Sequence, residues 1–222
     1  MKRYGQQCPL ARALDVVGER WNLLVVRELT LGPRRYRDLL DGLPGIPTNL
    51  LAARLKDLRA AGVISKRTLP PPTAVTVYEL TEAGRALRPA MRELRAWGQR
   101  YGPAPSETDV VQPAWALLSA SGRPTDLPEG RVCELRVDSE HFQLSAGESR
   151  LTVRGGSTQP ADAVITMSAD TLYRIMAGHL TAARRVIIEG NPMVTRHAIE
   201  SLRGALAAEP AQRAGASRPS RS

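Results

Sequence analysis

Apolar residues recur at helical spacing through most of the first hundred positions. The spacing predicts one helix over 10–17, with Pro9 in its first turn, and a second over 21–29 that ends at Gly32-Pro33. A short third helix is predicted over 36–40. Short helices joined by short loops therefore open the chain.

The segment 48–61 carries the most informative helical pattern. Thr48 can cap its first turn, and three leucines at spacings of four and three mark its buried face: Leu51, Leu55 and Leu58. Asn49, Ala53 and Lys56 point away from that face, since each residue turns the helix by about 100°. This outer face is small, polar and basic, and it fits the major groove of DNA, which is about 12 Å wide. Taken alone, the pattern fits an amphipathic helix with a solvated face at least as well.

Two alternating segments follow this helix. Gly62 ends the helix, and residues 63–69 and 75–80 alternate as strands. The run Pro70-Pro71-Pro72-Thr73 forces the turn between them. Two helices followed by a two-stranded hairpin form the layout of a winged helix-turn-helix.

Basic residues are concentrated in the first half of the chain. Of 222 residues, 31 are basic and 22 acidic, which gives a formal charge of +9. Residues 1–101 hold 18 basic and 9 acidic side chains, whereas residues 102–222 hold 13 of each. This asymmetry favours two domains, one of which faces a polyanion. A basic surface that only keeps the protein soluble is the alternative.

Several side chains of the winged layout converge on one side and are expected to contact double-stranded DNA. Basic residues at the start of the short helix suit phosphate, which a helix N-terminus favours, and the hairpin adds two more cations. On the outer face of 48–61, Asn can bond adenine and Ala can touch a thymine methyl group. The full set of expected contacts is Arg34, Arg35, Tyr36, Arg37, Thr48, Asn49, Ala52, Ala53, Lys56, Lys66 and Arg67.

A series of motifs runs through residues 8–101. Its members are Cys8-Pro9-Leu10, Gly18-Glu19-Arg20-Trp21, Arg27-Glu28-Leu29, Gly32-Pro33-Arg34-Arg35-Tyr36, Leu43-Pro44-Gly45-Ile46, Leu55-Lys56-Asp57-Leu58, Gly62-Val63-Ile64, Tyr78-Glu79-Leu80-Thr81 and Gly84. This series resembles the HxlR family of bacterial transcription regulators, which are MarR-like winged-helix proteins. The resemblance implies a cytoplasmic homodimer that places one helix-turn-helix in the major groove of each operator half-site, with a wing beside it.

The same resemblance implies that residues 81–101 form the dimerisation helix. Its helical stripe consists of Leu87, Met91, Leu94, Trp97 and Tyr101, which could also pack within one chain. Pro89 is expected to kink this helix or to mark a junction. Some family members sense oxidants through a cysteine at the position of Cys8, where a helix N-terminus and Arg12 could activate the thiol. A Cys-Pro pair without redox function is the alternative.

A period-two pattern replaces helical spacing in the second half. After a linker at 102–106, a short helix is expected around 115–118, and apolar positions then alternate in four strands. Their markers are Val132, Leu135 and Val137, then Phe142 and Leu144, then Leu151 and Val153, then Val164, Ile165 and Met167. These strands are predicted to form an antiparallel meander. Helices are expected over 170–177, 180–185 and 192–206, with Gly190-Asn191 capping the last.

The predicted fold class is therefore α+β. Residues 1–101 form a winged helix-turn-helix domain for DNA binding and dimerisation, and 102–106 form a linker. Residues 107–206 form a small domain with an antiparallel sheet and C-terminal helices, and 207–222 form a disordered tail rich in Ala, Pro, Arg and Ser.

The second half also resembles a known fold. The hydrophobic spacing and glycines of 163–168, 172–178 and 186–190 are similar to those of sterol carrier protein type 2. The resemblance implies an apolar cavity for a small apolar effector, with candidate lining residues Trp115, Phe142, Leu172, Tyr173, Met176 and Met193. Each of these residues could instead belong to the ordinary core, since a domain of this size needs most of them to fold.

Several classes of protein are not expected. No apolar run approaches the roughly 20 residues of a membrane span, and no signal peptide follows Met1. Cys8 and Cys133 cannot make a multi-cysteine zinc site, and the three histidines accompany no catalytic motif, so we expect no enzyme, metal or cofactor. The expected function is a ligand-responsive regulator. The rival is a constitutive DNA-binding protein whose second domain is a docking or assembly module.

Overall fold

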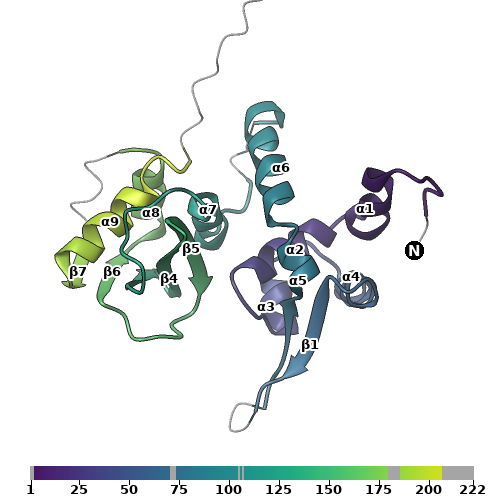
Figure 1. Cartoon of the computed structure of the whole chain (residues 1–222), viewed down its shortest axis with the longest axis horizontal. Helices are drawn as coiled ribbons and strands as arrows, with labels where there is room; N and C mark the ends of the chain where they lie inside the picture. Colours follow the sequence, from purple (N-terminus) through teal and green to yellow (C-terminus); the bar gives the residue numbers. More distant parts are fainter. Residues whose placement is uncertain (1–2, 71–73, 105, 107, 180–185, 207–222) are drawn as a thin grey trace, which may run out of the picture.

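The computed structural model describes residues 3–70, 74–104, 106, 108–179 and 186–206. Figure 1 shows helices and one hairpin in the N-terminal half, residues 3–104, and a sheet covered by helices in the C-terminal half, residues 106–206. Part of the predicted 70–73 turn, the predicted 180–185 helix and the predicted tail at 207–222 lie outside the described residues. None of the described helices is long and apolar enough to cross a membrane.

The N-terminal half has the predicted winged helix-turn-helix order. Its elements are α1 (Pro9–Val17), α2 (Asn22–Thr30), α3 (Tyr36–Asp41), α4 (Thr48–Ala60), β1 (Ile64–Thr68), β2 (Thr76–Leu80), α5 (Glu82–Arg85) and α6 (Arg88–Tyr101). Strands β1 and β2 pair antiparallel and form the wing. The core of this half includes the three leucines predicted on α4, all of which are buried.

The two ends of α4 follow from local sequence. Pro47 is the N-cap, and Thr48 is the first helical residue, so the prediction that Thr48 caps the helix is wrong. Pro47 has an extended backbone and is itself the residue directly before the helix, so Thr48 lies inside the first turn. At the other end Gly62 has φ +71°, and the Val63 amide donates to the Leu58 carbonyl at 2.9 Å. This arrangement is a Schellman motif, which turns the chain into the wing.

The predicted 81–101 helix is divided into α5 and α6. Thr81 caps α5, and α6 restarts at Arg88 with Pro89 in its first turn. Proline lacks the amide that a continuous helix would need, so it fits a helix start and marks the junction that the sequence predicts. Helix α6 then extends upward beside the C-terminal half in Figure 1.

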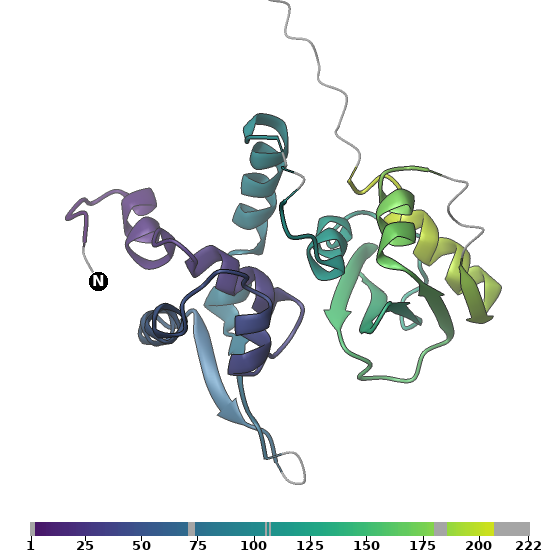
Figure 2. The same ribbon diagram turned by 180° about the vertical axis from the view of Figure 1, so that it is seen from behind.

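The C-terminal half contains a five-stranded mixed sheet. Its elements are α7 (Pro113–Ala120), β3 (Val132–Val137), β4 (Glu140–Gly147), β5 (Arg150–Gly155), β6 (Ala163–Met167), α8 (Ala169–Met176), β7 (Ile187–Gly190) and α9 (Pro192–Leu202). The strand order is β5-β4-β3-β6-β7. Helices α7, α8 and α9 lie together beside the sheet in both views (Figures 1 and 2).

The predicted four-stranded antiparallel meander is wrong at its fourth strand. Strands β3, β4 and β5 form a meander, but β6 pairs in parallel with β3. The segment 156–162 carries the chain from the β5 edge to the far side of β3, and alternating hydrophobicity does not encode this connection. The sequence also did not predict a strand at 187–190, which is β7 and pairs antiparallel with β6.

The two halves are joined by packing as well as by the chain. Leu31 follows α2, yet it is only 1% exposed and packs in the hydrophobic core of the C-terminal half. Its carbonyl accepts a hydrogen bond of 2.8 Å from the Gly155 amide at the end of β5. A residue of the first half therefore completes the core of the second, which ties α2 to the mixed sheet.

Candidate nucleic-acid interface and the cleft between the halves

Helices α3 and α4 are held together so that the outer face of α4 is open. The Tyr36 hydroxyl on α3 donates to the Thr48 carbonyl at the start of α4 at 2.8 Å. The start of α3 is itself capped, because the Arg35 amide donates to Asp38 at 2.9 Å. Most of the predicted DNA contacts on these helices are exposed: Arg35, Arg37, Thr48, Asn49, Ala52, Ala53 and Lys56. Tyr36 is half-buried, so it positions the start of α4 from within the structure.

Arg54 fixes α4 against the segment before α2. Its guanidinium pairs with Glu19 at 2.9 Å and with Asp57 at 3.5 Å. The Arg54 side chain is largely buried, so this pair is better defined than an exposed one. The orientation of α4 therefore depends on contacts made from its inner side.

The wing adds cations next to the end of α4. Lys66 and Arg67 are exposed on β1, and Arg67 pairs with Glu79 across the hairpin at 2.8 Å. A shallow hollow between α4 and β1 is lined by Lys56, Arg59 and Lys66 among others. Arg59 was not among the predicted contacts, although its position three residues after Lys56 places it on the same side of the helix.

Arg34 was predicted to contact DNA, but its side chain lies elsewhere. Its backbone pairs with Tyr78 on β2, with N···O distances of 2.9 and 2.8 Å. Its side chain points to the C-terminal half, since Nη2 would lie 3.4 Å from a Cβ atom placed on Gly155. Burial raises the pKa of Glu140, and the Arg34 guanidinium opposes that rise. Arg34 therefore belongs to the contact between the halves.

The predicted dimerisation stripe on α6 has two environments. Leu87 and Met91 pack against the core of the N-terminal half. Leu94, Trp97 and Tyr101 are exposed at 52%, 58% and 61%. Two leucines on α1 are exposed as well: Leu10 and Leu14. Helices α1 and α6 both project from the N-terminal half in Figures 1 and 2.

A cleft of about 750 Å³ lies between the halves. One wall comes from α2, β2, α5 and α6, and the other from α7 and β5. Its apolar lining includes Leu23, Leu24, Met91, Leu94, Trp115 and Leu118. Its basic lining consists of Arg27, Arg85, Arg88, Arg92, Arg95, Arg150 and Arg154.

Trp115 anchors α7 at one side of this cleft. Its indole N–H donates to Glu28 Oε1 at 2.8 Å, and the Arg27 guanidinium carbon lies 4.2 Å from the indole ring centroid. Glu28 is only 3% exposed and also pairs with Arg27 at 2.9 Å. Burial lowers the pKa of Arg27, and the charge and hydrogen bond of Glu28 oppose this. A buried ion pair on α2 is thus completed by a residue of the C-terminal half.

Comparison with known proteins finds a family match in each half of the chain. Residues 16–106 match the HxlR-like helix-turn-helix family. The HTH-type transcriptional regulator YodB of Bacillus subtilis is 34% identical over 95 residues, which cover 42% of this chain and 85% of YodB. The chain belongs to the HxlR-like helix-turn-helix family. Residues 128–203 match the SCP-2 sterol transfer family.

Further relatives share the HxlR-like part. An uncharacterized HTH-type transcriptional regulator of Mycobacterium tuberculosis is 42% identical over 96 residues, which cover 43% of this chain and 60% of that protein. The solved structure of reduced YodB covers 43% of this chain and 95% of YodB, at 33% identity and a TM-score of 0.40. The redox regulator HypR in its oxidized form covers 44% of this chain and all of HypR, at 28% identity and a TM-score of 0.40.

The residues predicted to hold an effector in this HxlR-like chain do not surround one described cavity. Phe142, Leu172 and Met176 are fully buried members of the C-terminal core. Tyr173 donates its hydroxyl to the Gln112 carbonyl at 2.8 Å, and Met193 is 44% exposed on α9. Of the six predicted residues, Trp115 lines the cleft. The core interpretation that the sequence left open therefore describes most of this set.

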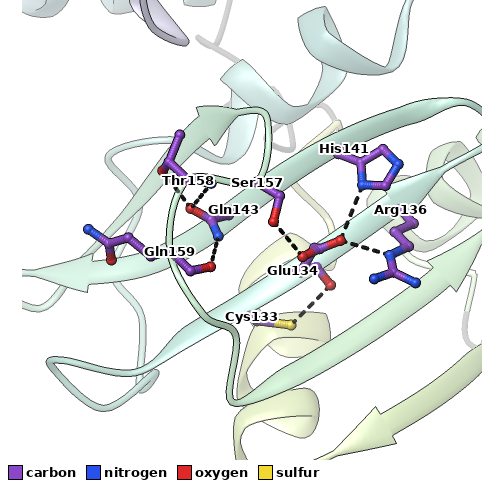
Figure 3. A network of polar contacts seen from close by, with 8 residues as sticks. All are labelled: Cys133, Glu134, Arg136, His141, Gln143, Ser157, Thr158 and Gln159. Atoms are coloured by element: carbon purple, nitrogen blue, oxygen red, sulfur yellow. Dashed lines mark hydrogen bonds and ion pairs between the residues drawn. The ribbon is translucent and has the colours of Figure 1, made fainter. Parts of the chain in front are cut away.

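A polar cluster on the sheet of this HxlR-like chain brings a serine, a histidine and a carboxylate together (Figure 3). Ser157 donates to Glu134 at 2.8 Å, and His141 Nδ1 lies 3.2 Å from the same carboxylate. Arg136 and the other bonds lower the pKa of Glu134 against the effect of its burial. A catalytic triad needs the serine on the histidine, whereas here both bond the glutamate. The cluster therefore joins β3, β4 and the segment that follows β5.

The two cysteines lie in different environments. Cys133 on β3 is buried, and burial together with the neighbouring Glu134 charge raises its pKa to about 12. Cys8 is exposed at the N-cap of α1. No group of three or more metal-binding side chains occurs in the parts of the chain that the structure describes.

Proposed function

We propose that this transcriptional regulator binds operator DNA as a cytoplasmic homodimer. Helix α4 enters the major groove of one half-site, and the wing follows the neighbouring backbone. The observation that carries this proposal is the open outer face of α4, with Asn49, Ala53 and Lys56 exposed next to the cations of the wing. Small and polar side chains allow close approach to bases, and the surrounding cations attract phosphate.

We propose that the homodimer forms through α1 and α6. The upper part of α6 exposes Leu94, Trp97 and Tyr101, and α1 exposes Leu10 and Leu14. Large apolar side chains that gather at an exposed surface favour association with a partner. Their position on projecting helices leaves α4 free for DNA.

We propose the domain division predicted from the sequence, at 102–106, with a regulatory C-terminal domain that responds to a small molecule. The contact between Trp115 and Glu28 supports this proposal, because it joins α7 directly to α2 of the DNA-binding half. A docking or assembly module is the alternative for the same domain. A partner that stays bound regardless of small molecules would support that alternative.

Operator binding is tested by mapping the bound sites across the genome and measuring affinity for the recovered sequence. Lys56→Ala and Asn49→Ala should weaken binding, because both change the outer face of α4. Arg196→Ala is the matched control, since this exposed arginine lies on α9 in the other half. Equal affinity of all three variants would contradict the proposed interface.

Cys8 carries a second proposal, that oxidation or alkylation of its thiol releases the regulator from DNA. Its exposure at the start of α1 makes it accessible, and α1 belongs to the proposed dimer contact. The relative HypR is named a redox regulator. Cys8→Ser should bind the operator normally and lose its response to diamide. Release by diamide that is unchanged in Cys8→Ser would exclude this proposal.

A further inference from the structure

We infer that the cleft between the halves binds an amphipathic anion, a molecule with an apolar body and a carboxylate or phosphate group, and that this molecule is the effector. The inference rests on the proposed regulation of DNA binding by the C-terminal half. It places the effector in the cleft, against both halves, instead of inside the sterol-carrier-like core.

The first support is the charge of the cleft. Seven arginines line it, and they come from both walls. The one carboxylate among its described lining residues, Glu79, pairs with Arg67 of the wing at 2.8 Å. Two of the seven arginines pair with carboxylates next to the cleft, Arg27 with Glu28 at 2.9 Å and Arg92 with Glu93 at 3.2 Å. The other five have no carboxylate partner within the described residues, and such an excess of cations favours an anion.

Three of these arginines converge from opposite walls. Arg88 begins α6, Arg85 ends α5 and Arg154 lies on β5. Partial burial, followed by the charges of Arg85 and Arg154, lowers the pKa of Arg88. Cations that repel each other in a partly desolvated site are stabilised by an anion placed between them. Guanidinium groups also bind carboxylate and phosphate through paired hydrogen bonds.

Hydrogen bonds to neutral groups leave the charges of three of these arginines uncompensated. Arg88 donates to the Thr30 carbonyl at 3.3 Å, and Arg95 donates to the Leu118 carbonyl at 2.6 Å. Arg150 donates to the Gly122 carbonyl at 2.8 Å. These partners are neutral, and none of the three arginines forms an ion pair with a carboxylate in the described parts of the chain. The carbonyl contacts orient the guanidiniums while their remaining N–H groups stay available.

The second support is the apolar part of the lining. Leu24 and Met91 come from the DNA-binding half, and Trp115 and Leu118 come from α7. The volume of about 750 Å³ lies within the range of pockets that hold drug-sized molecules. An apolar body would pack between these walls while its anionic group meets the arginines.

The position of the cleft explains how such a ligand would act. Its walls include α2, which packs in the DNA-binding core, and α6, which carries the proposed dimer face. Leu94 belongs to both the cleft lining and the exposed stripe of α6. A ligand shifts a protein only toward the arrangement that it binds better. Contacts with both walls favour one relative placement of the halves, and therefore one spacing of the two α4 helices in a dimer.

The test uses the full chain and three soluble probes at equal concentration. Octanoate has an apolar tail and a negative charge, octan-1-ol has the tail alone, and acetate has the charge alone. Octanoate is expected to raise the melting temperature and to bind in calorimetry, with at least tenfold higher affinity than the other two probes. Equal effects of octanoate and octan-1-ol would overturn the requirement for an anion.

Variants connect this binding to the arginines. Arg88→Gln combined with Arg154→Gln should lower octanoate affinity at least tenfold, whereas Arg196→Gln on α9 should leave it unchanged. Lysine at both positions 88 and 154 should restore most of the affinity, which separates loss of charge from loss of folding. Undiminished octanoate binding by the double glutamine variant would overturn the site.

Operator affinity measured with and without octanoate separates the two proposals. A change in the original chain that is absent in the double glutamine variant would support both the site and its regulatory action. Binding that depends on the arginines but leaves operator affinity unchanged would support the site and overturn its control of DNA binding. Operator binding that fails in all conditions would instead overturn the proposed function.

Discussion

Replacing Trp115 with phenylalanine tests the link between the halves. The substitution keeps an aromatic ring on α7 and removes the indole N–H that donates to Glu28 Oε1 at 2.8 Å. Glu28 is buried, so its carboxylate cannot replace the lost donor with bulk water. Arg27 would remain its partner at 2.9 Å. The change is therefore expected to weaken the contact, while the phenyl ring still fills most of the space of the indole.

The expected cost follows from these contacts. A hydrogen bond to a charged group contributes about 1.5–3 kcal/mol, and the weaker attraction of Arg27 to a phenyl ring adds at most about 1 kcal/mol. We therefore expect Trp115→Phe to lower the free energy of unfolding by about 1.5–4 kcal/mol. In a protein of this size 1 kcal/mol corresponds to about 2–4 °C, so the melting temperature should fall by roughly 3–16 °C.

Thermal and urea unfolding of the full chain measure this cost. Tyr4→Phe is the matched control, because the hydroxyl of this exposed tyrosine makes no hydrogen bond within the described residues, and the substitution also keeps an aromatic ring. It should change stability by less than about 0.5 kcal/mol. Both variants are measured at two protein concentrations, so that any effect on dimer formation is separated from folding. Equal losses in the two variants, or no loss in Trp115→Phe, would refute the role of the Glu28 contact.

Four further predictions follow from individual sites. Lys56→Ala should reduce the slope of log affinity against log salt by about 0.9 per protomer, measured by operator titration at several salt concentrations. Leu94→Glu should shift the protein toward monomer in analytical ultracentrifugation, because it charges an exposed apolar face. At pH 8, Cys8 should react with a thiol reagent while Cys133, whose pKa is about 12, reacts only after unfolding. Folding favours the protonated Cys133, so its contribution to stability should be present at neutral pH and decline as pH rises through about 12. Gly190→Ala should destabilise the chain in thermal unfolding, since φ is +89° and the new Cβ would lie 2.5 Å from the Asp162 carbonyl oxygen.

Most features set by neighbouring residues were predictable from the sequence, although the N-cap of α4 is Pro47 instead of the predicted Thr48. The leucine spacing of α4, the stop at Gly62 and the junction at Pro89 each depend on a few consecutive positions. The Asn191 cap is equally local, since its side chain accepts hydrogen bonds from the amides of Met193 and Val194. Backbone preferences of proline, glycine and capping residues act within one helical turn, which is why these predictions are confirmed.

Features that depend on distant segments were not predictable in the same way. The parallel pairing of β6 with β3 depends on a connection across the sheet, and the direction of Arg34 depends on β5 lying beside it. Part of the cleft was nevertheless visible in the sequence. Residues Arg85, Arg88, Arg92 and Arg95 recur at intervals of three and four, which places them on one side of successive helical turns. The sequence does not show that α7 and β5 lie opposite these arginines and close the cleft.

The basic residues of the first half therefore lie on two different surfaces. The cations next to α4 and on the wing are Arg35, Arg37, Lys56, Lys66 and Arg67, and five phosphate contacts would give a salt slope of about −4.5 per protomer. Arg34 and the arginines of α5 and α6 face the C-terminal half instead. A ligand inside the C-terminal core would have to displace buried side chains such as Phe142 and Leu172, and it would touch the DNA-binding half only indirectly. An anion in the cleft contacts both halves at once. Its binding energy consequently depends on their relative placement, which is the physical condition for control of one half by the other.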